Sequence, residues 1–207
     1  IVEGKFDRVG HRKVLVTTGR YGFRTYDVRD PGNPVPLDTF QPAEILGEYG
    51  YWQDEDMALD TRRKLIIGAL DPRHDDVDQA ACPGIGTISA KNRNPNCRSG
   101  FYVISYKDPR NLRQVGDFVD LPAGHTATCI DGCRYVWTGG PARRDDLPAL
   151  YPDVWTAFET GGRGDGRPIW VTDLRDARHP KVFDRPVDLW RNDGATDYSH
   201  DVQVDDH

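Results

Sequence analysis

The fold is decided by the stretch Gly22-Phe-Arg-Thr-Tyr-Asp-Val-Arg-Asp-Pro-Gly-Asn-Pro34, because closely similar stretches occur twice more. They are Gly100-Phe-Tyr-Val-Ile-Ser-Tyr-Lys-Asp-Pro-Arg-Asn-Leu112 and Gly166-Arg-Pro-Ile-Trp-Val-Thr-Asp-Leu-Arg-Asp-Ala-Arg-His-Pro180. In each copy β-branched and aromatic residues alternate, which is typical of a β-strand. An Asp-Pro or Asp-Ala turn follows, where the Asp carboxylate can accept hydrogen bonds from backbone N–H groups. A further short strand is predicted after each turn, at residues 35–40, 114–118 and 181–187.

A second motif alternates with the first and predicts a β-hairpin. One copy runs from Glu55-Asp-Met-Ala-Leu-Asp60 into Lys64-Leu-Ile-Ile-Gly-Ala69, and another from His125-Thr-Ala-Thr-Cys-Ile130 into Arg134-Tyr-Val-Trp-Thr-Gly139. His200-Asp-Val-Gln-Val-Asp205 begins the same hairpin, whereas Lys13-Val-Leu-Val-Thr-Thr-Gly19 matches only its second strand. The two motifs together give four strands per unit, which is the composition of a β-propeller blade.

The repeats predict one all-β domain over residues 1–207, a β-propeller fragment of about three four-stranded blades. Long insertions are expected at about 71–99 and 141–165. Closed propellers usually have four to eight blades, so we expect this chain to form part of a larger ring. The remaining blades would belong to the same protein or to another chain, and a three-bladed domain that is stable alone is the alternative.

The repeated strands resemble the LVIVD-repeat family of secreted bacterial β-propellers. The resemblance rests on the strands that here read Phe23-Arg-Thr-Tyr-Asp-Val28 and Tyr102-Val-Ile-Ser-Tyr106, and on the Asp-Pro turn that follows them. It covers most of the chain outside the two insertions. It implies a propeller fold more specifically than any activity, because propellers have many functions.

The composition excludes several classes of protein. The 207 residues carry a net charge of −6, with 21 Gly and 15 Pro and only 37% hydrophobic residues. No apolar run approaches the roughly 18 residues that would predict a membrane span. An acidic chain without a block of Lys and Arg gives no reason to expect nucleic acid as a partner. No secretory signal is present at Ile1, so an exported protein would be represented here by a mature or truncated chain.

The four cysteines favour an oxidising compartment. Cys129 and Cys133 are predicted to face each other across a hairpin tip in which Gly132 is left-handed, and Cys82 and Cys97 bracket a Gly- and Asn-rich loop. Of the three possible pairings, we favour 82–97 with 129–133. Four reduced thiols in a cytosolic protein remain the alternative, and a zinc site is disfavoured by the spacing.

The repeat places Glu55, His125 and His200 at equivalent positions, with Asp56, Thr126 and Asp201 beside them. In a propeller these residues would form a ring at the mouth of the central channel, where Glu55, His125 and His200 could bind a divalent transition metal. A polar funnel for a small ligand is a second interpretation, and simple capping of the strand ends is a third. The acidic stretch 71–78 could bind calcium, but it lacks the spacing of an EF-hand, and a solvated acidic loop is the favoured interpretation.

We therefore predict a secreted or cell-surface module that binds a protein or glycan partner or has a structural role. The alternative is a metal-dependent hydrolase or oxidoreductase with its site in the funnel. No catalytic motif argues for an enzyme, since the chain lacks a Gly-x-Ser-x-Gly elbow, a His-Glu-x-x-His pair and nucleotide-binding fingerprints.

Overall fold

The computed structural model describes residues 3–19, 22–41, 52–53, 56–72, 100–121, 124–139 and 169–187. These residues form fourteen strands and no helix, so the prediction of an all-β chain is confirmed for them. The strands are β1 (Gly4–Val9), β2 (Arg12–Thr17), β3 (Phe23–Asp27), β4 (Val35–Phe40), β5 (Trp52–Gln53), β6 (Met57–Asp60), β7 (Leu65–Pro72), β8 (Gly100–Ser105), β9 (Arg113–Gln114), β10 (Val119–Asp120), β11 (Thr126–Ile130), β12 (Tyr135–Gly139), β13 (Trp170–Asp173) and β14 (Lys181–Val182). Within this part of the chain, no helix is long and apolar enough to cross a membrane.

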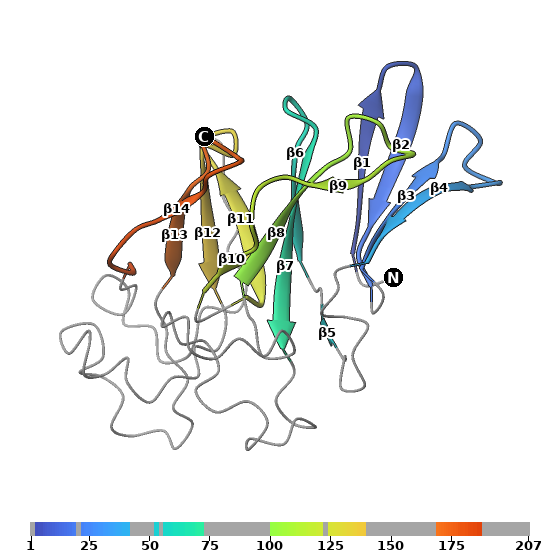
Figure 1. Cartoon of the computed structure of the whole chain (residues 1–207). Coiled ribbons are helices and arrows are strands. Elements are labelled where there is room, and N and C mark those ends of the chain that lie inside the picture. The colour runs from blue at the N-terminus through green and yellow to red at the C-terminus, as the bar shows by residue number, and fades with distance from the viewer. Residues whose placement is uncertain are drawn as a thin grey trace.

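The strands make three antiparallel sheets, which lie side by side in Figure 1. Sheet 1 has the order β1-β2-β3-β4, and sheet 3 has the equivalent order β11-β12-β13-β14. Sheet 2 has the same succession in β6, β7, β8 and β9, extended by β10 on β8 and by β5 on β7. Within this four-stranded unit, consecutive strands therefore pair with one another in all three sheets.

The three sheets repeat one another down to single hydrogen bonds. In each sheet, the residue that follows the third strand donates its backbone N–H to a carbonyl oxygen at or just before the start of the second strand. These bonds are Val28 to Lys13 at 2.9 Å, Tyr106 to Lys64 at 3.0 Å, and Leu174 to Arg134 at 2.8 Å. The following turn is also repeated, since Asp30, Asp108 and Asp176 each accept from the backbone N–H two residues later at 3.0 Å. The predicted role of these carboxylates is confirmed.

The last strand of sheet 1, β4, spans residues 35–40 as predicted, whereas those of sheets 2 and 3 are shorter than the sequence predicts. Instead of one strand over 114–118, the structure has β9 and β10, which pair with different parts of β8. Gly116 lies between them with φ of 72°, and a Cβ added there would lie 2.5 Å from the carbonyl oxygen of Arg178 in the neighbouring sheet. In sheet 3, β14 ends at Val182, and an isolated bridge joins Ile169 to Val187. The close approach of the next sheet interrupts the strand in sheet 2.

The first hairpin was missed by the sequence comparison. Residues of β1 pair with all of β2, from Gly4 opposite Thr17 to Val9 opposite Arg12. Gly10 begins the two-residue turn with φ of 59°, a left-handed conformation that glycine adopts without steric cost. Sheet 1 is therefore a complete four-stranded repeat.

The Cys129–Cys133 disulfide is present, with the Cα atoms 4.4 Å apart. The predicted hairpin geometry was wrong in register. Cys129 lies opposite Val136 in the β11–β12 ladder, so Cys133 belongs to the turn and does not face Cys129 across the strands. Asp131 and Cys133 have positive φ values together with Gly132, so the turn contains three consecutive left-handed residues. Cys82 and Cys97 lie outside the described residues.

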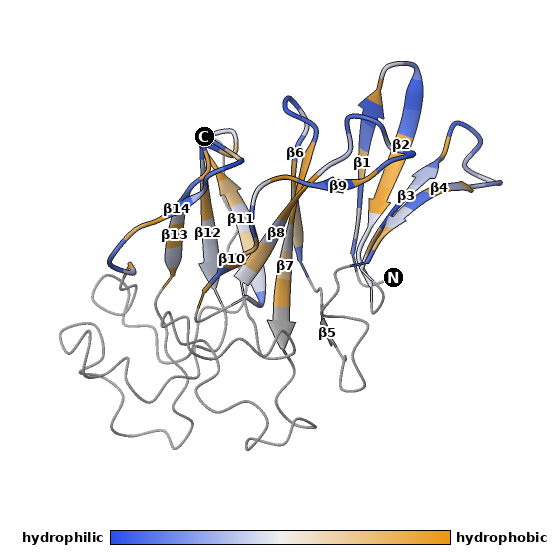
Figure 2. Ribbon diagram, in the orientation of Figure 1, coloured by the Kyte–Doolittle hydropathy of each residue, from blue (hydrophilic) through white to orange (hydrophobic). Residues whose placement is uncertain are grey.

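Sheet 2 lies between the other two sheets and is buried on both faces. Along β7, Leu65, Ile67 and Ala69 pack in a core shared with sheet 3, whereas Ile66 and Leu70 pack in a core shared with sheet 1. Figure 2 shows the resulting apolar band along the middle of the sheets, with hydrophilic turns at one end. This double burial explains why the strand is a nearly continuous hydrophobic run.

Candidate functional site

The first strands of the three repeats lie together and line one groove. The groove has a volume of about 530 Å³. Its walls are Gly4, Lys5 and Phe6 from β1, Ala58, Leu59 and Thr61 from β6 and the following turn, and Thr128 and Cys129 from β11. In the sequence these segments are more than fifty residues apart, and it is the stacking of the sheets that brings them together. We call this feature the first-strand groove.

A row of acidic side chains joins the sheets at the beginning of these strands. Glu3 of sheet 1 accepts a hydrogen bond at 2.6 Å from the backbone N–H of Met57, the first residue of β6. In the same way Asp56 of sheet 2 accepts at 3.1 Å from the backbone N–H of Ala127 in β11. Each acid therefore binds the first strand of the next sheet through its main chain.

Lys5 completes this row with a positive charge. Its Nζ lies 3.0 Å from Glu3 Oε1 and 3.9 Å from Asp56 Oδ1, and it also donates to the carbonyl oxygen of Met57. Lys5, which lies in β1 and also lines the groove, is thus close to both carboxylates. When both carboxyl groups are ionised, this cluster of two acids and one lysine carries a net charge of −1.

Burial and, to a lesser extent, the negative charge of Glu3 raise the pKa of Asp56 to about 6. The positive charge of Lys5 opposes this rise only in part. The side chain is 24% exposed, so water screens these charges only in part. At pH 6 about half of the Asp56 carboxyls hold a proton, and the acidic row can then act as a proton donor or acceptor near neutral pH.

We predict that Asp56→Asn changes the pH dependence of stability. The folded-state pKa lies above the unfolded value of about 3.8, so the folded protein binds more protons between pH 4 and 6. Wild-type stability relative to Asp56→Asn should therefore be highest below pH 4 and fall by roughly 2 kcal/mol as the pH rises above 6. Urea unfolding of both proteins across this range measures the difference. A constant difference, or one that increases with pH, would contradict the assignment.

Three of the six predicted site residues are described by the structure. Asp56 precedes β6, and His125 and Thr126 lie at the start of β11, where His125 is 7% exposed and donates its backbone N–H to Gly139. The Asp56–Ala127 hydrogen bond places Asp56 next to this segment. Asp56 and the start of β11 therefore lie side by side, and a ligand-binding role for these residues stays a prediction. Glu55, His200 and Asp201 lie outside the described residues, and so do residues 73–78 of the acidic stretch.

Sequence reasoning missed Glu3 and Lys5. Glu3 immediately precedes β1 and Lys5 lies in it, and β1 was not recognised as a strand. The signal was available in the alternation of Gly4-Lys-Phe-Asp-Arg-Val9 and in the Gly10-His11 pair that follows, since a two-residue turn with glycine marks a hairpin. Aligned by their turns, Glu3, Asp56 and Thr126 are equivalent residues of the three sheets.

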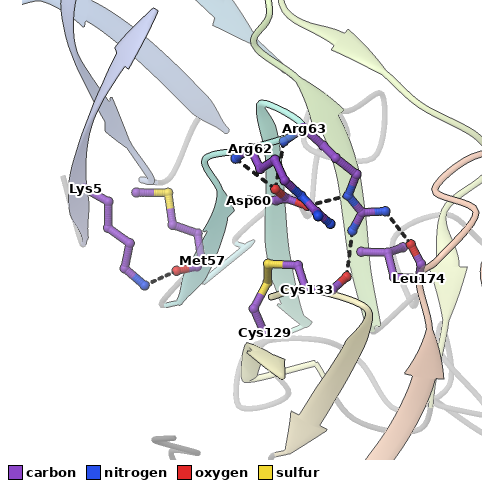
Figure 3. Close-up of a disulfide and its surroundings, with 8 residues drawn as sticks. All are labelled: Lys5, Met57, Asp60, Arg62, Arg63, Cys129, Cys133 and Leu174. Carbon is purple, nitrogen blue, oxygen red and sulfur yellow. Dashed lines mark hydrogen bonds and ion pairs between the residues drawn. A yellow bond between two sulfur atoms is a disulfide. The ribbon is translucent and has the colours of Figure 1, made fainter. Parts of the chain in front are cut away.

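At the other end of the sheets, Arg63 connects sheet 2 to sheet 3 (Figure 3). Its guanidinium donates to the carbonyl oxygens of Leu174 at 2.7 Å and Cys133 at 2.6 Å, and it also pairs with the buried carboxylate of Asp60. Lys64, the next residue, binds Asp7 of sheet 1 at 2.6 Å. Two neighbouring residues of the β6–β7 turn therefore connect sheet 2 to the sheets on either side, Arg63 to sheet 3 and Lys64 to sheet 1.

Among the described residues no group of three or more His, Cys, Asp or Glu side chains is arranged to hold a metal ion. The metal set Glu55, His125 and His200 stays a prediction, because two of its members are not described. The sequence matches no protein-family model, and no curated protein is similar to it.

Proposed function

We propose that the three sheets are consecutive blades of a β-propeller, and that the protein is a binding or structural module for a protein or glycan partner outside the cell. The observation that carries the proposal is the repetition of one four-stranded unit, stacked face to face, with β1, β6 and β11 lining a common groove. Propellers place the first strand of each blade around a central channel. Such a groove presents side chains of several repeats to one ligand.

The row of acids supports further blades beyond these three sheets. Glu3 and Asp56 each bind the following sheet, and Thr126 occupies the equivalent place in sheet 3. The Thr126 hydroxyl is buried and has no hydrogen-bond partner in the described part of the chain. A backbone N–H from a fourth sheet would satisfy it. On the outer face of sheet 1, Phe6 is 71% exposed, as expected of a blade whose neighbour is elsewhere.

An extracellular location is supported by the Cys129–Cys133 disulfide, because disulfides persist in oxidising compartments. Membership of the LVIVD-repeat family is part of the same proposal and rests on the strand and turn sequences alone.

The proposal is tested with a glycan array and, in parallel, an array of purified extracellular protein domains. We expect saturable binding of at least one ligand, with the ligand recovered chemically unchanged after incubation. Mass spectrometry of the recovered ligand separates binding from turnover. Absence of binding on both arrays, or conversion of a bound ligand to product, would contradict a binding module.

A further inference from the structure

A second groove lies between sheets 1 and 2, at the end of the sheets where the tight turns are (top in Figure 1). Its volume of about 480 Å³ is within the range of roughly 300–1,000 Å³ that is usual for ligand pockets. We call this feature the inter-sheet groove. Its walls come from sheet 1 and from the β8–β9 turn of sheet 2, and they are Arg12, Asp27, Arg29, Asp30, Asn33, Val35, Leu37 and Arg110.

The inter-sheet groove lies on the face of sheet 1 that is turned toward sheet 2. Asp27 is opposite Val14 in the β2–β3 ladder and opposite Val35 in the β3–β4 ladder, so these three side chains share one face. Val14 packs in the core that sheet 1 shares with sheet 2. A further sheet on the outer face of sheet 1, as proposed above, would therefore leave this groove uncovered.

Two hydrogen bonds between the sheets position Arg110 at the groove. The hydroxyl of Thr25 donates to the carbonyl oxygen of Pro109 at 2.6 Å, and the backbone N–H of Leu112 donates to Asp38 at 2.6 Å. These bonds hold the β8–β9 turn against sheet 1 on both sides of Arg110. The side chain of Arg110 is exposed and makes no hydrogen bond or ion pair within the described residues.

A buried carboxylate fixes two further arginines of the groove. Asp27 is buried and pairs with Arg12 at 2.9 Å and with Arg29 at 3.0 Å. Hydrogen bonds from Arg29 hold the pKa of Asp27 below its usual value, so the carboxylate stays ionised at neutral pH. Arg29 is 62% exposed and contacts Asp27 through Nε and Nη2, which leaves the N–H groups of Nη1 for a ligand.

The equivalent arginine of sheet 2 has a different role. Arg12 and Arg63 are equivalent, because each precedes the lysine whose carbonyl oxygen accepts the repeated hydrogen bond described above. Arg63 reaches across to the carbonyl oxygens of Cys133 and Leu174 in sheet 3. Arg12 instead binds Asp27 in its own sheet and makes no hydrogen bond to sheet 2 within the described residues. It therefore lines the inter-sheet groove and does not bridge it.

We propose that the inter-sheet groove binds an acidic peptide segment of a protein partner, with a carboxylate on Arg29 and Arg110 and an aliphatic side chain on Val35 and Leu37. The proposal rests on the binding function above and specifies the partner. Three arginines and two acids line the groove, so its net charge of +1 attracts an entering carboxylate. Clusters of arginine recognise acidic motifs because a guanidinium group binds a carboxylate through two parallel hydrogen bonds.

The lining of the groove favours a peptide over other polyanions. Sugars and nucleic-acid bases stack on aromatic side chains, whereas the described residues that line this groove include two aliphatic side chains and no aromatic ring. Val35 is 50% exposed and offers an apolar contact beside the arginines. An anionic membrane requires an apolar face that can insert into it, whereas these apolar side chains lie in a groove.

The partner is held by side chains and not by an added strand. β4 is the edge strand of sheet 1 in the described part of the chain. Pro36 in β4 has no N–H, and the N–H of Thr39 already donates to the carboxylate of Asp38 at 2.8 Å. Both features protect the edge of β4 against pairing with another chain. The charges of the peptide therefore decide how tightly it binds.

The test measures binding of the natural protein to an array of peptides in which Asp or Glu flank Leu, Ile or Val. The same peptides with Asn and Gln in place of the acids are the ligand control, and heparin and phosphatidylserine vesicles are assayed in parallel. We expect salt-sensitive binding of acidic peptides and binding of their amide counterparts that is weaker by about tenfold or more.

Arg110→Glu should weaken binding of the acidic peptides by about tenfold or more, because it replaces an attractive charge by a repulsive one. Arg178→Glu is the matched control, since Arg178 is exposed at the equivalent position of sheet 3 and does not line the groove. It should change binding by less than about twofold. Val35→Ser removes the aliphatic contact and should weaken binding by about threefold.

Thermal unfolding confirms that the variants fold, which is expected because these side chains are exposed. Equal binding by Arg110→Glu and Arg178→Glu would overturn the proposal, as would equal binding of acidic and amide peptides or a preference for heparin or vesicles. If a glycan or a protein domain from the arrays above is bound independently of Arg110, the binding function stands and this inference fails. If no ligand is bound in any assay, both fail.

Discussion

Replacing Gly68 by alanine should destabilise the protein by about 3 kcal/mol, because the new methyl group would overlap a buried aromatic ring. Gly68 lies in β7 on the face toward sheet 1, and a Cβ there would be 2.1 Å from Cζ of Phe23. The Phe23 ring is fully buried, so it cannot move aside into solvent. Chemical unfolding of Gly68→Ala measures the loss. The close approach of ring and backbone is what lets sheets 1 and 2 pack face to face.

Gly10→Ala is the matched control for this substitution. Gly10 has φ of 59° and no atom within 4 Å of an added Cβ, so alanine there suffers only the backbone penalty of roughly 1–2 kcal/mol. A double-mutant cycle with Phe23→Ala identifies the clash directly. Removing the ring should cost clearly less in the Gly68→Ala protein than in the wild type. Additive effects, or equal losses for the two glycine variants, would show that the ring does not pack on Gly68.

Arg63→Gln should lower the stability by about 3 kcal/mol, because it leaves a buried carboxylate without its cation. The side chain of Asp60 is 3% exposed, and it would retain only hydrogen bonds from the backbone N–H groups of residues 62 and 63. The carbonyl oxygens of Cys133 and Leu174 would lose their donor as well. Urea denaturation followed by intrinsic fluorescence measures the effect.

Arg62→Gln provides the comparison on the same turn. Its side chain is exposed and makes no side-chain hydrogen bond within the described residues, so its loss should change the stability by less than about 0.5 kcal/mol. Arg63→Lys should not restore stability, because an ammonium group cannot reach two carbonyls and a carboxylate in the fork geometry of guanidinium. Similar losses for the two arginine positions would contradict the proposed connection between sheets 2 and 3.

The repeats made the local structure of this chain predictable. The alternation in residues 100–105 and the Asp-Pro turn at Asp108 specify a strand and an Asx turn through contacts within a few residues, and both are present. The Cys129–Cys133 bridge was predictable for the same reason, because only three residues separate the two cysteines. What depends on short-range chemistry could be derived from the sequence.

Features created by the contact between sheets could not be derived in this way. The interruption between β9 and β10 depends on the carbonyl of Arg178 approaching Gly116 from another sheet. Equally, the bonds of Glu3 to Met57 and of Asp56 to Ala127 join residues more than fifty positions apart. The raised pKa of Asp56 follows from burial by that packing. Repeat symmetry predicted that Asp56 and Thr126 occupy equivalent positions, whereas the contacts that Glu3 and Lys5 add beside Asp56 came only from the stacking.

The charged turns at one end of the sheets illustrate how an overall composition conceals a local surface. The acidic net charge, averaged over the chain, gave no reason to expect nucleic acid as a partner. In the structure, acids such as Asp108 accept hydrogen bonds from backbone N–H groups of the turns, whereas cations such as Arg110 are exposed to solvent. A ligand meets the uncompensated groups rather than the average.

The central claim is that these three sheets are consecutive blades of a ring, and electron cryomicroscopy of the natural protein tests it most directly. The account predicts a closed ring in which β1, β6 and β11 are innermost and a further four-stranded sheet covers the outer face of sheet 1 at Phe6. A reconstruction without a ring, with the outer faces of sheets 1 and 3 open to solvent or covered by helices, would contradict it.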